Sequence, residues 1–551
     1  MRPYRLLPAL LGLLLFSCRP KEKADLLIYN ARVYTVDSAF SVVSAIAVRD
    51  GKVLATGTDA DIEGKYEGGE VLDAGGKAVY PGFIDAHSHF VGYSQSLYMA
   101  ALFGSASFEE VVQRVKDFAV GHPGRRWILG RGWDQNKFPG KVFPENTLLN
   151  AAFPGTPVVL ERVDGHALIA NARALELAGV KPGQTIAGGV IETKNGRLTG
   201  VMVDNAQRLV RAVVPEPSSA EYAEMLDKGQ NNCFGAGLTT VTDPGLDRAD
   251  VERLDSLQKS GWLKMRMYVM LSDNAANLQY YVPRGPYKTE LLYVKGVKAY
   301  ADGALGSRGA CLLRSYDDKP GWQGFLLRTP AHYDSLAAML AGTDFQLCTH
   351  AIGDSANRLI LQIYNKYLKG GNDKRWRIEH AQVIDSADFD LFGKASIIPS
   401  VQPTHATSDM YWAGERLGAR RLRGAYAFKQ LLRQNGWMPL GTDFPVEDIS
   451  PFKTFLAAVF RVDARGYPAG GFQKENALSR EEAIRGMTIW AAKADCLEKE
   501  VGSLEPGKSA DLIILDRDLM SVGQGEVLQT KVESTWARGK KVFDRGGEGK
   551  K

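Results

Sequence analysis

The chain has 551 residues, of which 45% are hydrophobic and 24% are charged, and its formal net charge is +5 at pH 7. This composition is typical of a soluble protein and excludes wholesale disorder, collagen and a protein with many membrane spans. The small net charge, with no dense basic run in the interior, excludes nucleic acid as the expected partner. The length has room for three or four domain-sized units, or for one large barrel with insertions.

The first 17 residues are typical of a secretory signal. Two arginines precede an apolar run, Leu6 to Phe16, that is too short to span a bilayer as a helix. The string LFSC, which ends at Cys18, resembles the bacterial lipoprotein box. We therefore expect an exported protein with a signal peptide over 1–17, a lipid anchor at Cys18 in the cell envelope, and a polar tether over 18–24. An ordinary cleaved signal beside an incidental cysteine is the alternative.

Short strands are expected near both ends of the chain. Residues 25–80 alternate apolar and polar side chains between Gly and Asp, and Asp50-Gly51 indicates a hairpin. Residues 500–551 have the same character. Because the two ends of a domain often lie close together, we expect these segments to form one composite β-sandwich.

Between these ends, apolar strand-like runs alternate with helical stretches. The eight candidate strands lie at 78–89, 237–245, 264–271, 296–303, 345–354, 375–382, 395–403 and 438–446. This alternation predicts an α/β fold with a (β/α)8 TIM-like barrel over 81–499. The stretch from about 92 to 228 does not fit the alternation and is too long for a loop. We expect it to form an inserted α+β subdomain.

The first signal for chemistry is a pair of histidines at the end of the first candidate strand. His87 and His89 are two residues apart, so strand periodicity places both side chains on one face. Two imidazoles with this spacing can bind one metal at the C-terminal rim of a barrel, where such enzymes hold their chemistry. The motif HxH is weak alone, and its context PGFIDAHSH strengthens it.

The second signal is a lysine in an apolar strand. Lys298 lies between two apolar residues and shares a strand face with Asp302. An ammonium group inside a barrel is costly to desolvate. Carboxylation of the amine by CO₂ would convert it into a carboxylate-like metal ligand. Lys295 is the competing candidate, and a surface or salt-bridged lysine is the alternative interpretation.

Three further polar residues end candidate strands. His350 and His380 are 30 residues apart, about one βα unit of a barrel, and Asp443 ends the last candidate strand. Taken alone, each histidine is more often structural, and an aspartate at such a place is more often a helix N-cap. In the company of the earlier residues all three become candidate metal ligands, and Asp443 becomes a candidate general base.

These positions, in this order, resemble the amidohydrolase superfamily. Its pattern is HxH on strand one, Lys on strand four, His on strands five and six, and Asp on strand eight. The segments KAYADGALGSRGA, THAIGD, RIEHAQ, GTDFPV and RVDGHALIANARAL are similar to the amidohydrolase-3 branch, which contains N-substituted formamide deformylases and YtcJ-like proteins. The resemblance covers nearly all of the chain after about residue 25.

The resemblance implies a metal-dependent hydrolase that cleaves an amide C–N bond, other than a peptide bond, in a small molecule. It implies one or two Zn²⁺ or other divalent ions, bridged by a carboxylated Lys298. The implied ligands are His87, His89 and Asp443 for one metal, and His350 and His380 for the second. Metal-activated hydroxide would attack the carbonyl carbon, while Asp443 takes the proton and passes it to the leaving nitrogen.

Four residues near the barrel mouth are candidates for substrate contact. His166, in RVDGHA, would touch the substrate or the developing oxyanion, and Asp302 lies just past Lys298 at the rim. Arg308 would pair with a substrate carboxylate or bridge loop carbonyls. Trp133, in GRGWDQ, would line the pocket from the insertion, although a tryptophan at such a place more often packs in a core.

Two other functions stay open at this point. A deaminase or cyclic-amide hydrolase could use the same scaffold, although mononuclear deaminases on it generally lack the lysine of strand four. A surface lipoprotein that binds metal or ligand without turnover is the third interpretation. Barrels of this kind often dimerise, so a homodimer is a further expectation.

Overall fold

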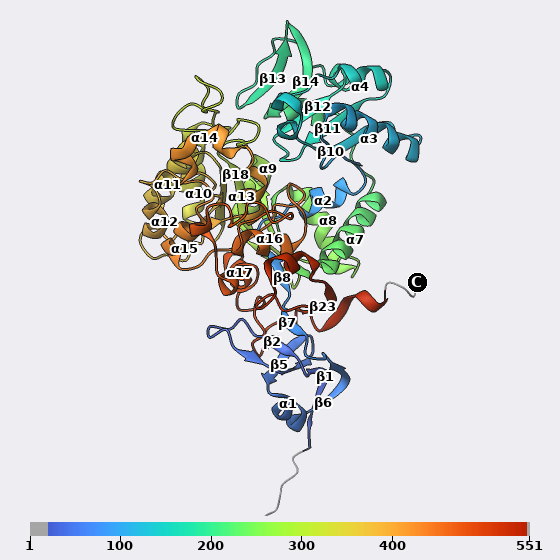
Figure 1. The fold of residues 1–551 in the computed structure, drawn as a ribbon, viewed down its shortest axis with the longest axis vertical. Helices are drawn as coiled ribbons and strands as arrows, with labels where there is room; N and C mark the ends of the chain where they lie inside the picture. The colour runs from blue at the N-terminus through green and yellow to red at the C-terminus, as the bar shows by residue number, and fades with distance from the viewer. Residues whose placement is uncertain (1–19, 548–551) are drawn as a thin grey trace, which may run out of the picture.

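The computed structural model describes residues 20–547, so the predicted signal over 1–17 and the lipid-bearing Cys18 lie outside the described residues. Three parts follow one another along the long axis of the molecule (Figure 1). A β-rich part lies at the bottom of the view, a barrel at its centre, and an inserted sheet at its top. Among the described residues, no helix is both long and apolar enough to cross a membrane.

The central part is a curved sheet of parallel strands. Its order is β21-β20-β19-β18-β16-β15-β8. The strands are β8 (Phe83–Asp85), β15 (Leu238–Leu246), β16 (Arg266–Ser272), β18 (Leu292–Tyr300), β19 (Gln346–Ala351), β20 (Arg377–His380) and β21 (Ile398–Ser400). Most of their side chains are buried, as expected for parallel strands that are covered by helices. The covering helices include α7 (Ser219–Gly235), α8 (Arg248–Lys259), α10 (Pro330–Ala341), α11 (Asp354–Tyr367), α15 (Phe428–Asn435) and α17 (Arg480–Gly486).

Residues 439–443 close the barrel between its two edge strands. Leu440 forms a parallel bridge with Val401, just beyond β21. On the other side, the carbonyl of Leu440 accepts the N–H of Ala86 at 3.2 Å, and the N–H of Asp443 donates to the carbonyl of His87 at 2.7 Å. Each of the eight predicted runs therefore contributes to the barrel, and the predicted (β/α)8 fold is confirmed.

Strands from the two ends of the chain lie in one sheet below the barrel. β22 (Leu512–Leu515) pairs antiparallel with both β7 (Ala78–Pro81) and β23 (Val532–Ala537). The sheet has the order β24-β23-β22-β7-β2-β3, and its other strands are β2 (Arg32–Tyr34), β3 (Val42–Val43) and β24 (Lys540–Asp544). A second sheet has the order β5-β4-β1-β6, with β4 (Ala45–Arg49), β5 (Lys52–Gly57) and β6 (Tyr66–Asp73). Its β1 (Glu22–Tyr29) starts inside the expected 18–24 tether, because Glu22 pairs with Tyr66 of β6. The last part of that segment is therefore strand.

The insertion is a six-stranded sheet of order β13-β14-β12-β11-β10-β9. Its strands are β9 (Ala100–Ala101), β10 (Ile128–Trp133), β11 (Val158–Arg162), β12 (Ala167–Ala170), β13 (Gly189–Lys194) and β14 (Arg197–Asp204). Helix α3 (Phe108–Gly121) packs against β10 through its apolar face. The predicted end of the insertion, near residue 228, falls within α7. This helix packs on α2 (Phe90–Ser96) and β15, so it belongs to the barrel.

Candidate metal centre

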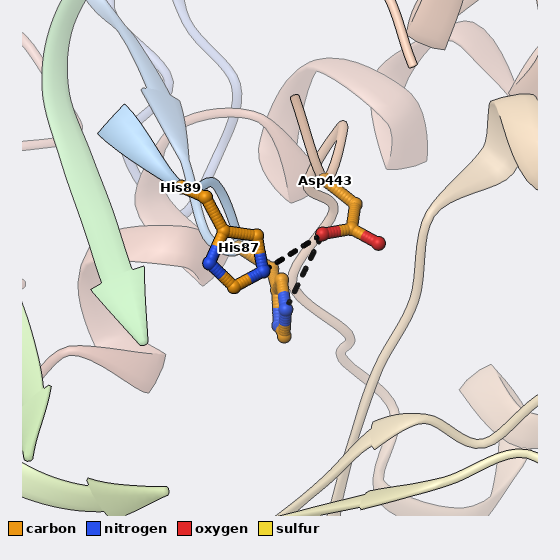
Figure 2. A group of neighbouring side chains, drawn as sticks. All are labelled: His87, His89 and Asp443. Atoms are coloured by element: carbon orange, nitrogen blue, oxygen red, sulfur yellow. Dashed lines mark ion pairs between the residues drawn. The ribbon is translucent and has the colours of Figure 1, made fainter. Parts of the chain in front are cut away.

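The first and last barrel segments bring one group of ligand atoms together. The Nε2 of His89 lies 3.2 Å from Oδ1 of Asp443, and the Nε2 of His87 lies 3.7 Å from the same oxygen (Figure 2). One ligand atom from each of these three side chains lies within 4.8 Å of the other two. The spacing lets a single cation contact all three.

Asp443 also belongs to a second group, with His380 and His405. One ligand atom from each again lies within 4.8 Å of the others. The Nε2 of His405 lies 3.6 Å from Oδ2 of Asp443. His405 comes from α13 (Pro403–Asp409), the helix after β21. The two oxygens of one carboxylate therefore face histidines from different parts of the barrel rim.

His350 and Lys298 lie beside these two groups. The ring centroid of His350 is 4.5 Å from that of His380. The Nζ of Lys298 is 3.3 Å from Nε2 of His87, and the lysine is almost fully buried. The fold thus brings all six predicted ligand residues to the same end of the barrel.

Two buried carboxylates position the first histidine. Oε2 of Glu379 lies 2.5 Å from Nδ1 of His87, which leaves Nε2 directed at Asp443. A carboxylate partner of this kind fixes the ring orientation of a metal-binding histidine. Asp85 accepts hydrogen bonds from the backbone N–H of Thr442 at 3.0 Å and from its hydroxyl at 2.6 Å. Asp85 therefore ties the first barrel strand to the last segment.

The protonation states of these side chains suit metal binding. Burial lowers the pKa of His87 to about 4, and it lowers the pKa values of His350 and His380 well below the usual range. Burial alone would raise the pKa of Asp443, but the imidazoles around the carboxylate, that of His89 first, hold that pKa well below its usual value. Neutral imidazoles and an ionised carboxylate are the forms that bind a cation.

Three buried polar atoms at the centre have no hydrogen-bond partner within residues 20–547. They are Nε2 of His350, Nε2 of His405 and Oδ1 of Asp443. An unpaired buried polar group costs about 1–3 kcal/mol, so three in one place require an explanation. Imidazole nitrogens and carboxylate oxygens are ligands that Zn²⁺ prefers. The residues present therefore fit a divalent cation.

A cavity of about 690 Å³ opens over these side chains. The metal-centre residues that line it are His89, Lys298, His350, His380, His405 and Asp443. The inserted sheet contributes Arg131, Asp164 and His166 to the opposite wall. The cavity therefore lies between the barrel and the insertion.

Of the four predicted substrate contacts, one lines this cavity and three do not. His166 lines it, and its Nδ1 is 2.7 Å from Oδ1 of Asp204. Asp302 does not line it. The Asp302 carboxylate instead accepts backbone N–H groups of Cys311, Ile352 and Gly353 at 2.7–3.0 Å. This carboxylate holds the loop after β18 against the end of β19, and its contact with substrate stays a prediction.

The other two predicted contacts also lie away from the cavity. Arg308 forms an ion pair with Asp318, with Nη2 2.8 Å from Oδ2, because that loop supplies its own carboxylate. Trp133 is fully buried in the core of the insertion, and its indole N–H donates to the carbonyl of Leu160 at 2.8 Å. Both side chains have partners within the chain, and their contact with substrate stays a prediction.

Residues 70–543 match the sequence model of the family described as "Amidohydrolase family". The chain belongs to the Amidohydrolase family. "Protein LONG AFTER FAR-RED 3" of Arabidopsis thaliana is 32% identical over 94% of this chain and 92% of its own. The N-substituted formamide deformylase of Arthrobacter pascens is 26% identical over 96% of this amidohydrolase and 99% of its own chain.

A solved structure agrees with this assignment. An uncharacterized metal-dependent hydrolase from Pyrococcus horikoshii is 28% identical to this amidohydrolase and superposes with a TM-score of 0.74. The match covers 91% of this chain and 99% of the other. The predicted family and fold are confirmed, and the function at this level is that of a metal-dependent hydrolase.

Two residues at the centre of this amidohydrolase are not singled out by the sequence patterns. Glu379 directly precedes His380, and strict strand alternation would place the two side chains on opposite faces. His380 has a φ of 72°, which ends that alternation and turns its ring toward His87 as well. His405 lies on a helix, two residues past a candidate strand. That position is the one signal the sequence offers for it.

Proposed function

We propose that this amidohydrolase hydrolyses the C–N bond of an N-formyl or N-acyl amine of small size. The observation that carries the proposal is the carboxylate of Asp443, shared by two histidine groups at the base of the 690 Å³ cavity. A cavity of this volume matches a small-molecule site. The near full-length similarity to an N-substituted formamide deformylase supports an amide as the substrate class.

The site residues have separate tasks in this reaction. His87, His89 and Asp443 would hold one divalent cation, and His380 would hold a second with His405 or His350. When bound, a cation such as Zn²⁺ polarises a carbonyl group and lowers the pKa of water to about 7. Asp443 is kept ionised and accepts the proton that the attacking water loses. The C–N bond then breaks to give a carboxylic acid and an amine.

We also propose that Lys298 is carboxylated. Its Nζ lies inside the barrel, 3.3 Å from Nε2 of His87, and among the described residues no carboxylate lies within 4.0 Å of it. Burial lowers its pKa, which favours the neutral amine that reacts with CO₂. The reaction forms an N–C bond and releases one proton. The resulting carbamate offers two oxygen ligands to the centre.

The main experiment assays the purified protein, supplied with Zn²⁺ and bicarbonate, against four substrates. These are an N-formyl amine, an N-acetyl amine, adenine and a cyclic amide. Release of amine from either of the first two supports the proposal. Release of ammonia from adenine, or ring opening, favours the deaminase or cyclic-amide alternative. Bound metal without turnover of any substrate favours the non-catalytic binding protein.

The role of Lys298 has a separate test. Lys298→Ala is expected to lower the hydrolytic activity by more than about 100-fold. Loss of a ligand's hydrogen-bond partner lowers activity by up to roughly 100-fold. Activity should return when a short-chain carboxylate is added, because that anion can replace the carbamate. Full activity without any added carboxylate would remove Lys298 from the centre.

Export and the lipid anchor at Cys18 are proposals that rest on the sequence of the first 18 residues. Metabolic labelling with a palmitate analogue should mark the full chain and should not mark Cys18→Ser. A homodimer is proposed from the frequency of dimers among such barrels. Sedimentation velocity of the purified protein would distinguish a dimer from a monomer.

A further inference from the structure

The inserted sheet brings one histidine to the metal centre. His166 ends the turn between β11 and β12, where Oδ1 of Asp164 accepts its backbone N–H at 3.0 Å. The ring centroid of His166 lies 5.0 Å from that of His350, and the row continues to His380 at 4.5 Å and to His87 at 4.9 Å. The ring of His166 therefore extends the row of barrel histidines to the wall formed by the insertion.

Asp204 holds the ring of His166 in place through two contacts. Oδ1 of Asp204 is 2.7 Å from Nδ1 of His166, and the backbone N–H of Asp204 donates to the carbonyl of His166 at 2.8 Å. The carboxyl group is fully buried. A histidine held in this way through Nδ1 presents its other nitrogen, Nε2, as the functional atom.

The barrel loop after β18 is shaped around the same carboxylate. A Cβ atom added at Gly303 or at Gly309 would lie 2.5 Å from Oδ2 of Asp204. Both glycines are required at these positions because the carboxylate occupies the space of a side chain. This loop follows the strand that carries Lys298. The contact fixes the position of His166 relative to the metal centre.

We propose that His166, positioned by Asp204, donates the proton that the leaving nitrogen needs. The inference rests on the proposed amide hydrolysis and assigns one of its steps. The fully buried carboxylate of Asp204 lies 2.7 Å from Nδ1 of His166 and can compensate a positive charge on the ring.

The proton transfer balances without a further reactant. The Nε2–H bond of His166 breaks as an N–H bond forms on the leaving nitrogen, which keeps the electron pair of the broken C–N bond. Asp443 holds the proton taken from water and returns it to solvent, and His166 regains a proton from solvent. The base and the acid are then two residues, one from the barrel and one from the insertion.

The test compares two substrates with one acyl group. One is an alkylamide, whose amine must be protonated to leave, and the other is a nitrophenyl ester, whose leaving group needs no proton. His166→Gln is expected to slow hydrolysis of the alkylamide by about 100-fold or more. The same variant should slow hydrolysis of the ester by less than about tenfold. Equal losses on both substrates, or no loss, would overturn the assignment.

A second variant and a control complete the experiment. Asp204→Asn keeps the imidazole and should show the same selective loss on the alkylamide, so it answers the question if His166→Gln does not fold. His122→Gln changes an exposed histidine of the same insertion and should leave both rates unchanged. Metal content per chain is measured for every variant. A wild-type protein that hydrolyses neither substrate contradicts the proposed function, whereas an active wild type with equally slowed variants contradicts the role of His166 alone.

Discussion

Glu379 and His87 form a fully buried hydrogen-bonded pair, with Oε2 of the glutamate 2.5 Å from Nδ1 of the imidazole. Burial would raise the pKa of Glu379, but its close contact with His87 lowers it to about 2. The carboxylate is therefore ionised at neutral pH, and the imidazole donates to it. The pair directs Nε2 of His87 toward Asp443, so the first metal group depends on a residue that contacts no metal.

Glu379→Gln is expected to lower Zn²⁺ affinity by about 10–100-fold, because loss of a carboxylate partner weakens the orientation and basicity of a bound histidine. Competition with a fluorescent chelator measures the affinity. Glu481→Gln, at an exposed glutamate, is the matched control. An unchanged Zn²⁺ affinity in Glu379→Gln would show that His87 needs no such partner.

His405→Gln is expected to remove about one metal ion per chain from a protein that binds two, because His405 and His380 share the second group with Asp443. Elemental analysis gives the metal content. His350→Gln is measured beside it, since Nε2 of His350 is also unpaired at the centre. Two ions in His405→Gln and one in His350→Gln would assign the second group to His350 instead.

His87, His350 and His380 should contribute little to any loss of Zn²⁺ affinity on the acidic side. Protons compete with metal only below the pKa of each ligand, and burial lowers the pKa of His87 to about 4 and those of His350 and His380 well below 6.5. Ordinary imidazoles would cost roughly tenfold in affinity per histidine between pH 7.5 and 5.5. Three ordinary imidazoles would therefore lower the Zn²⁺ affinity by roughly 1,000-fold. His87, His350 and His380 should together lower it by much less. Zn²⁺ titrations at the two pH values measure the loss, and a loss near 1,000-fold would contradict the prediction.

Trp133→Ala is expected to lower the free energy of unfolding by about 3–5 kcal/mol, because the indole is fully buried in the core of the insertion. Urea unfolding measures the effect. Trp262→Ala is the control, since that tryptophan is 51% exposed and should change stability by less than about 1 kcal/mol. If Trp133→Ala left the stability unaltered and raised KM, the result would show that Trp133 contacts the substrate.

The barrel and most of the centre are predictable from sequence because both follow from local patterns. His87, His350 and Asp443 each end an apolar run, and parallel strands bring such ends to one rim. His405 depends instead on how a helix packs over that rim, which no local pattern encodes. Trp133 ends a strand in a glycine-rich context that is typical of a site, yet the choice between cavity and core is made by the tertiary packing of the inserted sheet.

The seam between β8 and residues 439–443 has a consequence for the order of synthesis. His87 and Asp443 would contact the same cation from opposite sides of the seam, although 356 residues separate them in the chain. At about 5–20 residues per second, a ribosome needs roughly 20–70 s to reach Asp443 after it has made His87. During that interval the first two histidines have no carboxylate to complete their site. The cation can therefore be captured fully only after the last barrel segment has emerged and closed against the first.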